Sequence, residues 1–445
     1  MKSVDLTSGR IGTSLIKLAA PITLTGFVEM AYSLTDMFWI SQDGADYVSA
    51  IGACSNFLWL ATCFITIARV GGQIKVGHSV GAKDFDRAKL YIRSAFQLGI
   101  SITLIFSIIF LFFPNILMSI FGFDSKNAIN AGVSYLKIQS FAIPAQFSAI
   151  IFTGIFSALG NSKVSLLANS IGLIVNMILD PLLILGLKLG VIGAALATLT
   201  AQYIVFILFF IIAKRKQEYF KGTNILSGKD GTKIIEITKL GIAPAIQSSI
   251  FSIVSLYIGR MVAGYGTFAV GAQKVGAQLE AISWKTSDGL GTAMNAFSAQ
   301  NYGANKLERA KRGYIVSLFI LLFFGGLSTF LLLCFPSELM SIFFKEPNVI
   351  DIGANYLYIM GFSQIFMCLE LVTNGALAGL GITFLPNILC TIIVSSRIIL
   401  APILSSVGFG ITGIWLSITI SSIVAGISSF IIYIYVWKKK FNKMV

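Results

Sequence analysis

Charged side chains are scarce in this chain of 445 residues, where Asp, Glu, Lys and Arg together make up only 12%. Soluble domains carry roughly 25% charged residues, so a soluble fold of this length would lack the polar surface that it needs. By contrast, 56% of the residues are hydrophobic, and they lie in long blocks separated by short polar gaps. This pattern predicts a polytopic membrane protein.

Histidine and cysteine are also rare. The single histidine, His78, falls in a basic loop, which excludes a histidine-based metal site or catalytic dyad. The five cysteines all fall in apolar segments without metal-type spacing, so we expect buried thiols. The N-terminus shows no pattern of a cleavable signal peptide and leads directly into a full-length span. We expect no resident cofactor.

Twelve segments are each near the roughly 20 residues that a helix needs to cross a bilayer. The predicted spans are 15–40, 48–72, 91–113, 131–158, 164–186, 190–213, 238–263, 267–296, 313–335, 353–380, 384–407 and 410–437. The net charge of +14 does not indicate a nucleic-acid partner, because the Lys and Arg residues gather in every second loop and in the tail. By the positive-inside rule, we expect both termini to lie in the cytoplasm.

The chain repeats itself at a nearly constant offset. "PNILMSIFG" begins at Pro114, and "PSELMSIFF" begins 222 residues later at Pro336. "GAKDFDRAK" begins at Gly81 and returns as "GANKLERAK" at Gly303, with the same offset. Since each half holds six spans, both halves insert the same way up, as parallel repeats.

These repeats predict an all-α membrane protein with two six-helix lobes around a central cleft, and rocking of the lobes would give alternating access. The expected domains are an N-terminal lobe, a cytoplasmic linker, a C-terminal lobe and a basic tail: 1–213, 214–237, 238–437 and 438–445.

Two aspartates fall inside predicted spans, where an unpaired charge costs roughly 2.5–3.5 kcal/mol. Asp36 and Asp180 both lie about 8 Å below the outer boundary of their spans. Asn176 precedes Asp180 by one helical turn, and Thr198 is a nearby hydroxyl. Such oxygens suit a hard cation such as Na⁺. A carboxylate pair would equally suit a proton, so the coupling ion remains open between H⁺ and Na⁺.

The repeat supplies a control for Asp180. The equivalent position in the second half is Ala401, although the following prolines, Pro181 and Pro402, match. The carboxylate is therefore not required for the helix and its proline, which favours a functional role.

A second group of ionisable residues lies nearer the middle of the bilayer. We expect these residues to attract a cationic or zwitterionic organic substrate, with the arginine balancing their charge. The group consists of Glu29, Glu280, Asp288, Glu370 and Arg397. The alternative is a closed salt-bridge network that only holds the helices together.

Several segments resemble the multidrug and toxic compound extrusion (MATE) family. "LAAPITLTGFVEMAYSLTDMFWI" resembles its first helix, and "NSIGLIVNMILDPLLILGLKLGVIGAALAT" its fifth and sixth. "AFSAQNYGANKLERAK" is similar to its repeated cytoplasmic loop, and "GLGITFLPNI" and "GFGITGIW" resemble segments of its tenth to twelfth helices. The resemblance covers essentially the whole chain.

This resemblance implies an inner-membrane antiporter that expels organic, often cationic, compounds in exchange for Na⁺ or H⁺. It also implies that Asp36, Asp180 and Asn176 carry the coupling ion. One position departs from the family, because Ser252 stands where some relatives have a glutamate. Glu280 matches an acidic position of another branch. The expected partners are small organic substrates, the coupling cation and the bilayer, and the expected state is a monomer.

Three other functions compete with transport by an antiporter. A lipid-linked oligosaccharide flippase of the same superfamily would have a strongly cationic cleft, whereas the charges here are mixed. An intramembrane enzyme could use two aspartates as acid and base, but the chain lacks a GxGD-type protease motif. A passive channel suits buried carboxylates and a two-lobed architecture less well. We therefore expect a transporter and not an enzyme.

Overall fold

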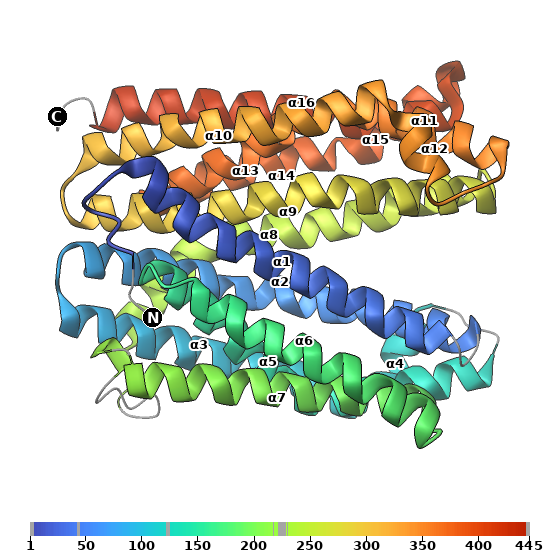
Figure 1. Cartoon of the computed structure of the whole chain (residues 1–445), viewed down its shortest axis with the longest axis horizontal. Helices are drawn as coiled ribbons and strands as arrows, with labels where there is room; N and C mark the ends of the chain where they lie inside the picture. The colour runs from blue at the N-terminus through green and yellow to red at the C-terminus, as the bar shows by residue number, and fades with distance from the viewer. Residues whose placement is uncertain are drawn as a thin grey trace. The chain divides into compact units, whose positions relative to one another are not determined.

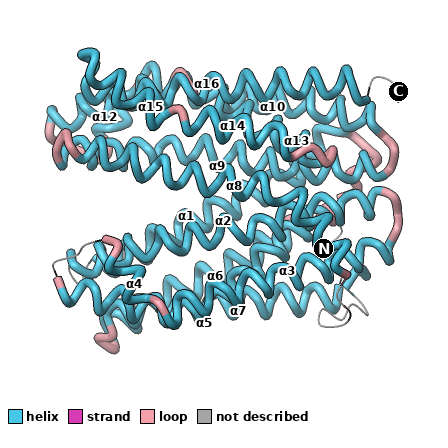
Figure 2. Tube along the Cα trace, turned by 180° about the vertical axis from the view of Figure 1, so that it is seen from behind, coloured by secondary structure: helices cyan, strands magenta, loops and turns pink. Residues whose placement is uncertain are grey.

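The computed structural model describes residues 4–41, 45–121, 125–216, 218–220, 228 and 230–441. In this part of the chain, every regular element is helical and no strand occurs (Figures 1 and 2). Some charged residues of the predicted loops and tail, including Lys221, Lys229 and Lys443, lie outside the described residues. The same holds for parts of the predicted 214–237 linker and of the 438–445 tail.

Sixteen α-helices, α1 to α16, and four short 3-10 or π segments, η1 to η4, make up the described fold. In the first half they are α1 (Ile11–Ser41), α2 (Ala45–Gly81), α3 (Phe85–Phe112), α4 (Pro114–Ser119), α5 (Lys126–Ala158), α6 (Lys163–Pro181), η1 (Leu182–Gly186), α7 (Gly190–Lys216) and η2 (Glu218–Phe220). In the second half they are α8 (Gly231–Ala263), α9 (Thr267–Gly303), α10 (Leu307–Cys334), α11 (Pro336–Ser341), α12 (Pro347–Gly361), α13 (Gln364–Gly379), α14 (Phe384–Ser395), α15 (Arg397–Leu404), η3 (Ser405–Phe409), α16 (Gly410–Val436) and η4 (Trp437–Phe441).

The predicted spans each coincide with helical segments of the structure. Nine described helices are long and apolar enough to cross a membrane, and a bent pair gives a tenth. Helix α9 is long enough but too polar to be counted this way, because it carries Lys274, Glu280, Lys285 and Asp288. The helical run Phe384–Lys439 contains two predicted spans, 384–407 and 410–437. The all-helical, twelve-span class predicted from the sequence is confirmed.

The predicted span 353–380 is not one straight helix. Helices α12 and α13 meet at a 48° bend between Gly361 and Gln364. At this break the Ser363 hydroxyl donates to the Met360 carbonyl over 2.8 Å. A side chain that bonds to nearby backbone competes with the regular helix ladder, so apolar content alone gave no sign of the bend.

Contacts divide the chain into two compact units. The first unit comprises Met1–Val4 and Leu24–Ala245, and the second comprises Asp5–Thr23 and Ile246–Val445. Helices α1 and α8 therefore each contribute their first part to one unit and the remainder to the other. The domain boundaries at 214 and 237 remain a prediction from the sequence. The division by contacts differs from them because its boundaries fall inside α1 and α8.

Phenylalanine fills much of the core of the first unit. Phe152 stacks on Phe209 with ring centroids 5.4 Å apart, and Phe156 lies between Phe209 and Phe220 at 5.8 and 5.9 Å. Helices α2, α3, α5 and α7 supply this core, with α5 in contact with the other three (Figure 1). Helix α6 packs on α7 and carries the residues of the candidate site.

The end of α6 has a proline and a π turn that recur in the second unit. Pro181 leads into η1, as Pro402 leads into η3. Close packing fixes both turns, since a methyl group at Gly193 would overlap the backbone of Leu183, and one at Gly413 would overlap that of Leu404. Asp180 thus lies directly before the proline that leads into a closely packed turn.

Candidate functional site

Asp180 and Asn176 form the buried centre of the candidate site. Both side chains are fully buried, at 0% exposure, on the face of α6 that packs inward. The Asn176 Nδ2 donates to Asp180 Oδ1 over 3.2 Å. The one-turn spacing predicted from the sequence therefore places the two side chains in direct contact.

Asp36 of α1 joins this pair within the first unit. Its carboxylate lies close enough to Asp180, Asn176 and Thr198 to interact with all three. The structure thus brings together the four residues that the sequence singled out, from α1, α6 and α7. Tyr32 lies one turn before Asp36 on the same helix and interacts with Asp36 and Thr198.

Several polar atoms at this place are buried, and none of them makes a hydrogen bond of standard geometry in the described part of the chain. They are Tyr32 OH, Asp36 Oδ1, Asn176 Oδ1, Asp180 Oδ2 and Thr198 Oγ1. Nearly all buried polar atoms in proteins are paired, so a group of five at one place requires an explanation. All five are oxygens, and two belong to carboxylates, which is the donor set that binds a proton or a hard cation.

The described residues contain no group of three or more His, Cys, Asp or Glu side chains that could hold a metal ion. The donor set at Asp36 and Asp180 differs from such a group, because two carboxylates are joined by amide and hydroxyl oxygens. Such oxygen ligands suit a hard cation.

Two residues of this site were missed in the sequence. Tyr32 precedes Asp36 by four residues, so its place on the same helical face could have been inferred from spacing. Tyr135 of α5 is 5% exposed and lies near both Asp36 and Asp180. No local pattern links Tyr135 to the aspartates, because that contact depends on how α5 packs against the other helices.

The second group of ionisable residues has its centre at Arg397 in the second unit. Arg397 is 7% exposed, and its guanidinium donates to Ser421 Oγ over 2.6 Å and to Ser422 Oγ over 3.0 Å. Glu280 and Glu370 both lie near enough to interact electrostatically with it. One arginine thus balances two carboxylates inside this unit.

The other predicted members of this group are placed differently. Glu280 is 8% exposed and accepts from Gln364 Nε2 over 3.3 Å, and Glu370 accepts from Gln247 Nε2 over 2.9 Å. Asp288 is half-buried on α9, and Glu29 is an exposed residue of the first unit. The structure therefore brings Glu280, Glu370 and Arg397 together. Glu280 and Arg397 are buried, whereas residues that line an open cleft would be more exposed.

Comparison with known proteins identifies the fold and the family. The MatE family model matches residues 21–182 and again 244–403, which together exceed half of the chain. The two matches fall on the two halves of the internal repeat. A solved structure, "Crystal structure of MATE in the bent conformation", aligns with a TM-score of 0.92 at 18% identity, covering 100% of this chain and 99% of that one.

Curated relatives agree with the family match over nearly their full length. The chain is 23% identical to "Probable multidrug resistance protein YoeA" of Bacillus subtilis (strain 168) over 437 residues, which is 96% of this chain and 94% of that protein. It is 24% identical to "Multidrug export protein MepA" of Staphylococcus haemolyticus (strain JCSC1435) over 427 residues, which is 94% of this chain and 93% of that protein. These names do not favour the flippase alternative. With a two-part family match over most of the sequence and an all-helical fold to match, the chain belongs to the MatE family and is a MATE transporter of the membrane.

Proposed function

We propose that this transporter is a secondary active antiporter that exports organic cations or zwitterions in exchange for H⁺ or Na⁺. The coupling ion binds at Asp36 and Asp180, with Asn176, Thr198 and Tyr32 around it. The observation that carries this proposal is the group of five buried oxygens that make no hydrogen bond of standard geometry among the described residues. Such oxygens are costly to bury unless a proton or a cation satisfies them during the transport cycle.

Coupling follows from the charge of this site. With both carboxylates ionised, the site carries two negative charges in a small buried volume, and each destabilises the other. Binding of one proton or one Na⁺ removes part of that repulsion. The loaded and unloaded sites therefore favour different surroundings, and an ion that prefers one conformation shifts the equilibrium toward it.

The two candidate ions make different demands on the side chains. A proton needs only the carboxylates, one of which then donates to the other. Na⁺ needs several oxygens at once, and Asn176 Oδ1, Thr198 Oγ1 and Tyr32 OH would complete its shell. Removing a neutral oxygen therefore weakens Na⁺ binding while leaving the proton-carrying groups in place.

Substrate recognition belongs, in this proposal, to Glu280 and Glu370 of the second unit. Their two carboxylates exceed the single charge of Arg397, so the group attracts a cation or the cationic part of a zwitterion. The multidrug names of the curated relatives support organic substrates. The cleft between the lobes stays a prediction from the sequence, as do the inner membrane, the cytoplasmic termini and the monomeric state.

Transport in reconstituted vesicles tests the proposal. Purified protein in liposomes, with ethidium as the probe, is given a H⁺ gradient or a Na⁺ gradient in separate experiments. We expect one gradient to drive ethidium movement and Asp36→Asn or Asp180→Asn to abolish it, because an amide neither cycles a proton nor supplies the charge that holds Na⁺. Asp86→Asn, which alters an exposed carboxylate at the start of α3, is the control and should transport normally.

Two results would contradict this assignment. Wild-type rates in either aspartate variant would show that the pair is structural. Ethidium movement down its own gradient with neither ion required would show a passive pathway.

A further inference from the structure

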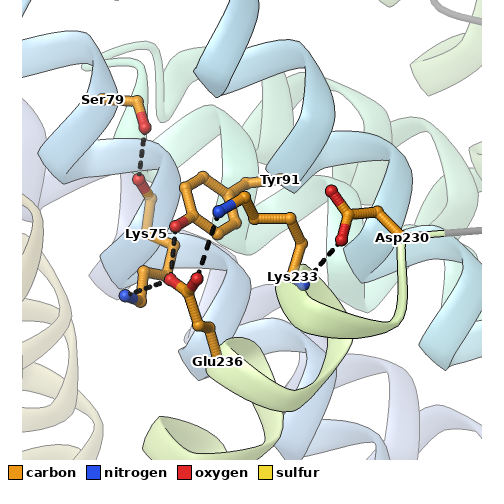
Figure 3. Close-up of polar contacts among 6 residues, drawn as sticks. All are labelled: Lys75, Ser79, Tyr91, Asp230, Lys233 and Glu236. Atoms are coloured by element: carbon orange, nitrogen blue, oxygen red, sulfur yellow. Dashed lines mark hydrogen bonds and ion pairs between the residues drawn. The ribbon is translucent and has the colours of Figure 1, made fainter.

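The first part of α8 is attached to the first unit by a polar cluster centred on Glu236 (Figure 3). Glu236 Oε2 accepts from Lys75 Nζ of α2 over 2.7 Å and from Tyr91 OH of α3 over 2.5 Å. Glu236 Oε1 accepts from Lys233 Nζ over 3.1 Å, one turn earlier on α8 itself. One carboxylate thus joins three helices, and we call this cluster the Glu236 clamp.

Tyr91, the clamp residue from α3, is fully buried, at 0% exposure. Three cations lie over its ring: Lys75 at 5.6 Å, Arg87 at 5.7 Å and Lys233 at 5.3 Å from the centroid. Cations stacked on an aromatic face add to a charged hydrogen bond. Glu236 remains only partly exposed, at 28% of its side chain, so solvent weakens these interactions without removing them.

Next to the clamp, the backbones of α2 and α8 pack closely against each other. A methyl group at Gly71 would overlap the carbonyl of Ile237, and one at Gly241 would overlap the carbonyl of Ile67. The contact is reciprocal: Ile237, which Gly71 faces, lies one turn before Gly241, and Ile67, which Gly241 faces, lies one turn before Gly71. Helices that approach this closely through small residues resist sliding or separation without loss of many contacts.

The second unit holds the segment before α1 in a similar way. Arg309 donates to the backbone carbonyls of Leu6, Ser8 and Gly9 over 3.2, 2.5 and 2.9 Å. Asn301 Nδ2 also donates to the Leu6 carbonyl, over 3.0 Å. Arg309 belongs to "GANKLERAK", and its counterpart in "GAKDFDRAK" is Arg87, which lies over the ring of the clamp tyrosine. The repeated loop motif therefore places an arginine at the segment before α1 in one unit and at the Tyr91 ring of the clamp in the other.

We propose that Glu236 is a positioning residue that keeps the first part of α8, Gly231–Ala245, docked on α2 and α3 throughout the transport cycle. Lys75 and Tyr91 are the partners that matter, because they come from other helices. Lys233 contacts the same carboxylate from within α8 and also lies over the Tyr91 ring of α3, so it contributes to docking as well. The proposal rests on the protein being a transporter, but it does not depend on which coupling ion is used. It therefore goes beyond the function proposed above.

Hydrogen exchange tests the clamp without any substrate. The backbone amides of 231–245 should exchange about fivefold faster in Lys75→Ala and in Tyr91→Phe, equivalent to about 1 kcal/mol. The control Lys239→Ala removes a charge from an exposed position of the same helix and should change exchange by less than about twofold. Lys75→Arg should restore the wild-type rate. Equal effects of Lys75→Ala and Lys239→Ala, or no effect of Lys75→Ala, would overturn the proposal.

Cross-linking then tests whether the clamp ever opens. Lys75→Cys and Glu236→Cys are combined with Cys334→Ser, which removes the exposed native thiol, and are joined by a reducible bifunctional thiol reagent. Cross-linked protein should move ethidium in liposomes at the wild-type rate, and the same protein before cross-linking should be slower. If cross-linking stops transport and reduction restores it, the helices separate during the cycle and the proposal is wrong. If the wild type moves no ethidium, the antiport proposal fails and hydrogen exchange alone decides on the clamp.

Discussion

The Asn176 amide donates to Asp180 Oδ1 over 3.2 Å, and this bond leaves Asp180 Oδ2 and Asn176 Oδ1 without a hydrogen bond of standard geometry among the described residues. Asn176 therefore orients the carboxylate with its nitrogen and retains a free oxygen for an ion. The same residue type at another position would not do both. Asn169, two turns earlier on α6, instead donates to the Ser165 carbonyl of its own helix over 2.8 Å.

This difference gives the first prediction. If Na⁺ is the coupling ion, Asn176→Ala should raise the Na⁺ concentration for half-maximal ethidium transport by roughly tenfold or more, because a hydrogen bond to a charged group contributes about 1.5–3 kcal/mol. Asn169→Ala, on the same helix, should leave that concentration nearly unchanged. Equal shifts in the two variants would mean that α6 is disturbed as a whole.

The Tyr32 hydroxyl distinguishes the two candidate ions. Tyr32→Phe removes one neutral oxygen from the site and leaves both carboxylates in place. For Na⁺ coupling we expect affinity for the ion to fall by about three- to tenfold, whereas proton-driven transport should keep its rate. Tyr203→Phe serves as the control, since that hydroxyl donates to the Phe141 carbonyl at an exposed position. Loss of transport under both gradients would contradict a ligand role for Tyr32.

The balance of charge around Arg397 can be tested by removing its members singly and together. Arg397→Ala leaves Glu280 and Glu370 buried without a counter-charge, which should cost about 3–5 kcal/mol of stability. Adding Glu280→Gln should recover part of that loss, and melting temperatures of the single and double variants measure the coupling. Purely additive effects would show that the two side chains do not interact.

Glu280→Gln alone separates a substrate site from a structural network. A substrate role predicts unequal changes of affinity, larger for cationic than for neutral compounds, with the ion requirement unchanged. A network role predicts a lower melting temperature with the ranking of substrates preserved. Drug-resistance profiles and melting curves on this one variant decide between them.

The packed turn after Asp180 should be sensitive to a single methyl group. Gly193→Ala would push the backbone of Leu183 away, and overpacking of this kind costs typically about 1–3 kcal/mol. Gly271→Ala on α9 meets no atom within 4 Å and should be neutral or slightly stabilising. Thermal unfolding measures both. A neutral Gly193→Ala would show that η1 is free to shift.

Much of the fold followed from composition, because apolar blocks of bilayer length are read directly from the chain. The contact of Asn176 with Asp180 was also predictable, because residues four apart on a helix share a face. The bend between α12 and α13 did not, although the hydroxyl of Ser363 bonds to the Met360 carbonyl at the break. Hydropathy records how apolar a segment is and not whether its helix is continuous.

Contacts between distant segments were beyond local patterns. Tyr135 reaches the aspartates only because α5 packs in the first unit, and Glu236 meets Lys75 across 161 residues of sequence. The repeated loop motif was visible as a duplication, but its partners were not. Arg309 binds backbone carbonyls, and any residue type supplies those, so no sequence signal marks Leu6, Ser8 and Gly9 as its partners.

The division of α1 and α8 between the two units bears on how the protein is made. Asp5–Thr23 is synthesised before the rest of its unit, because the helices that hold it, α9 and α10, follow only after the whole first half. The first unit, in turn, is complete only when the start of α8 has emerged. Neither half of the duplicated gene product can then mature alone, and a chain divided between the repeats should yield two fragments that fold only when produced together.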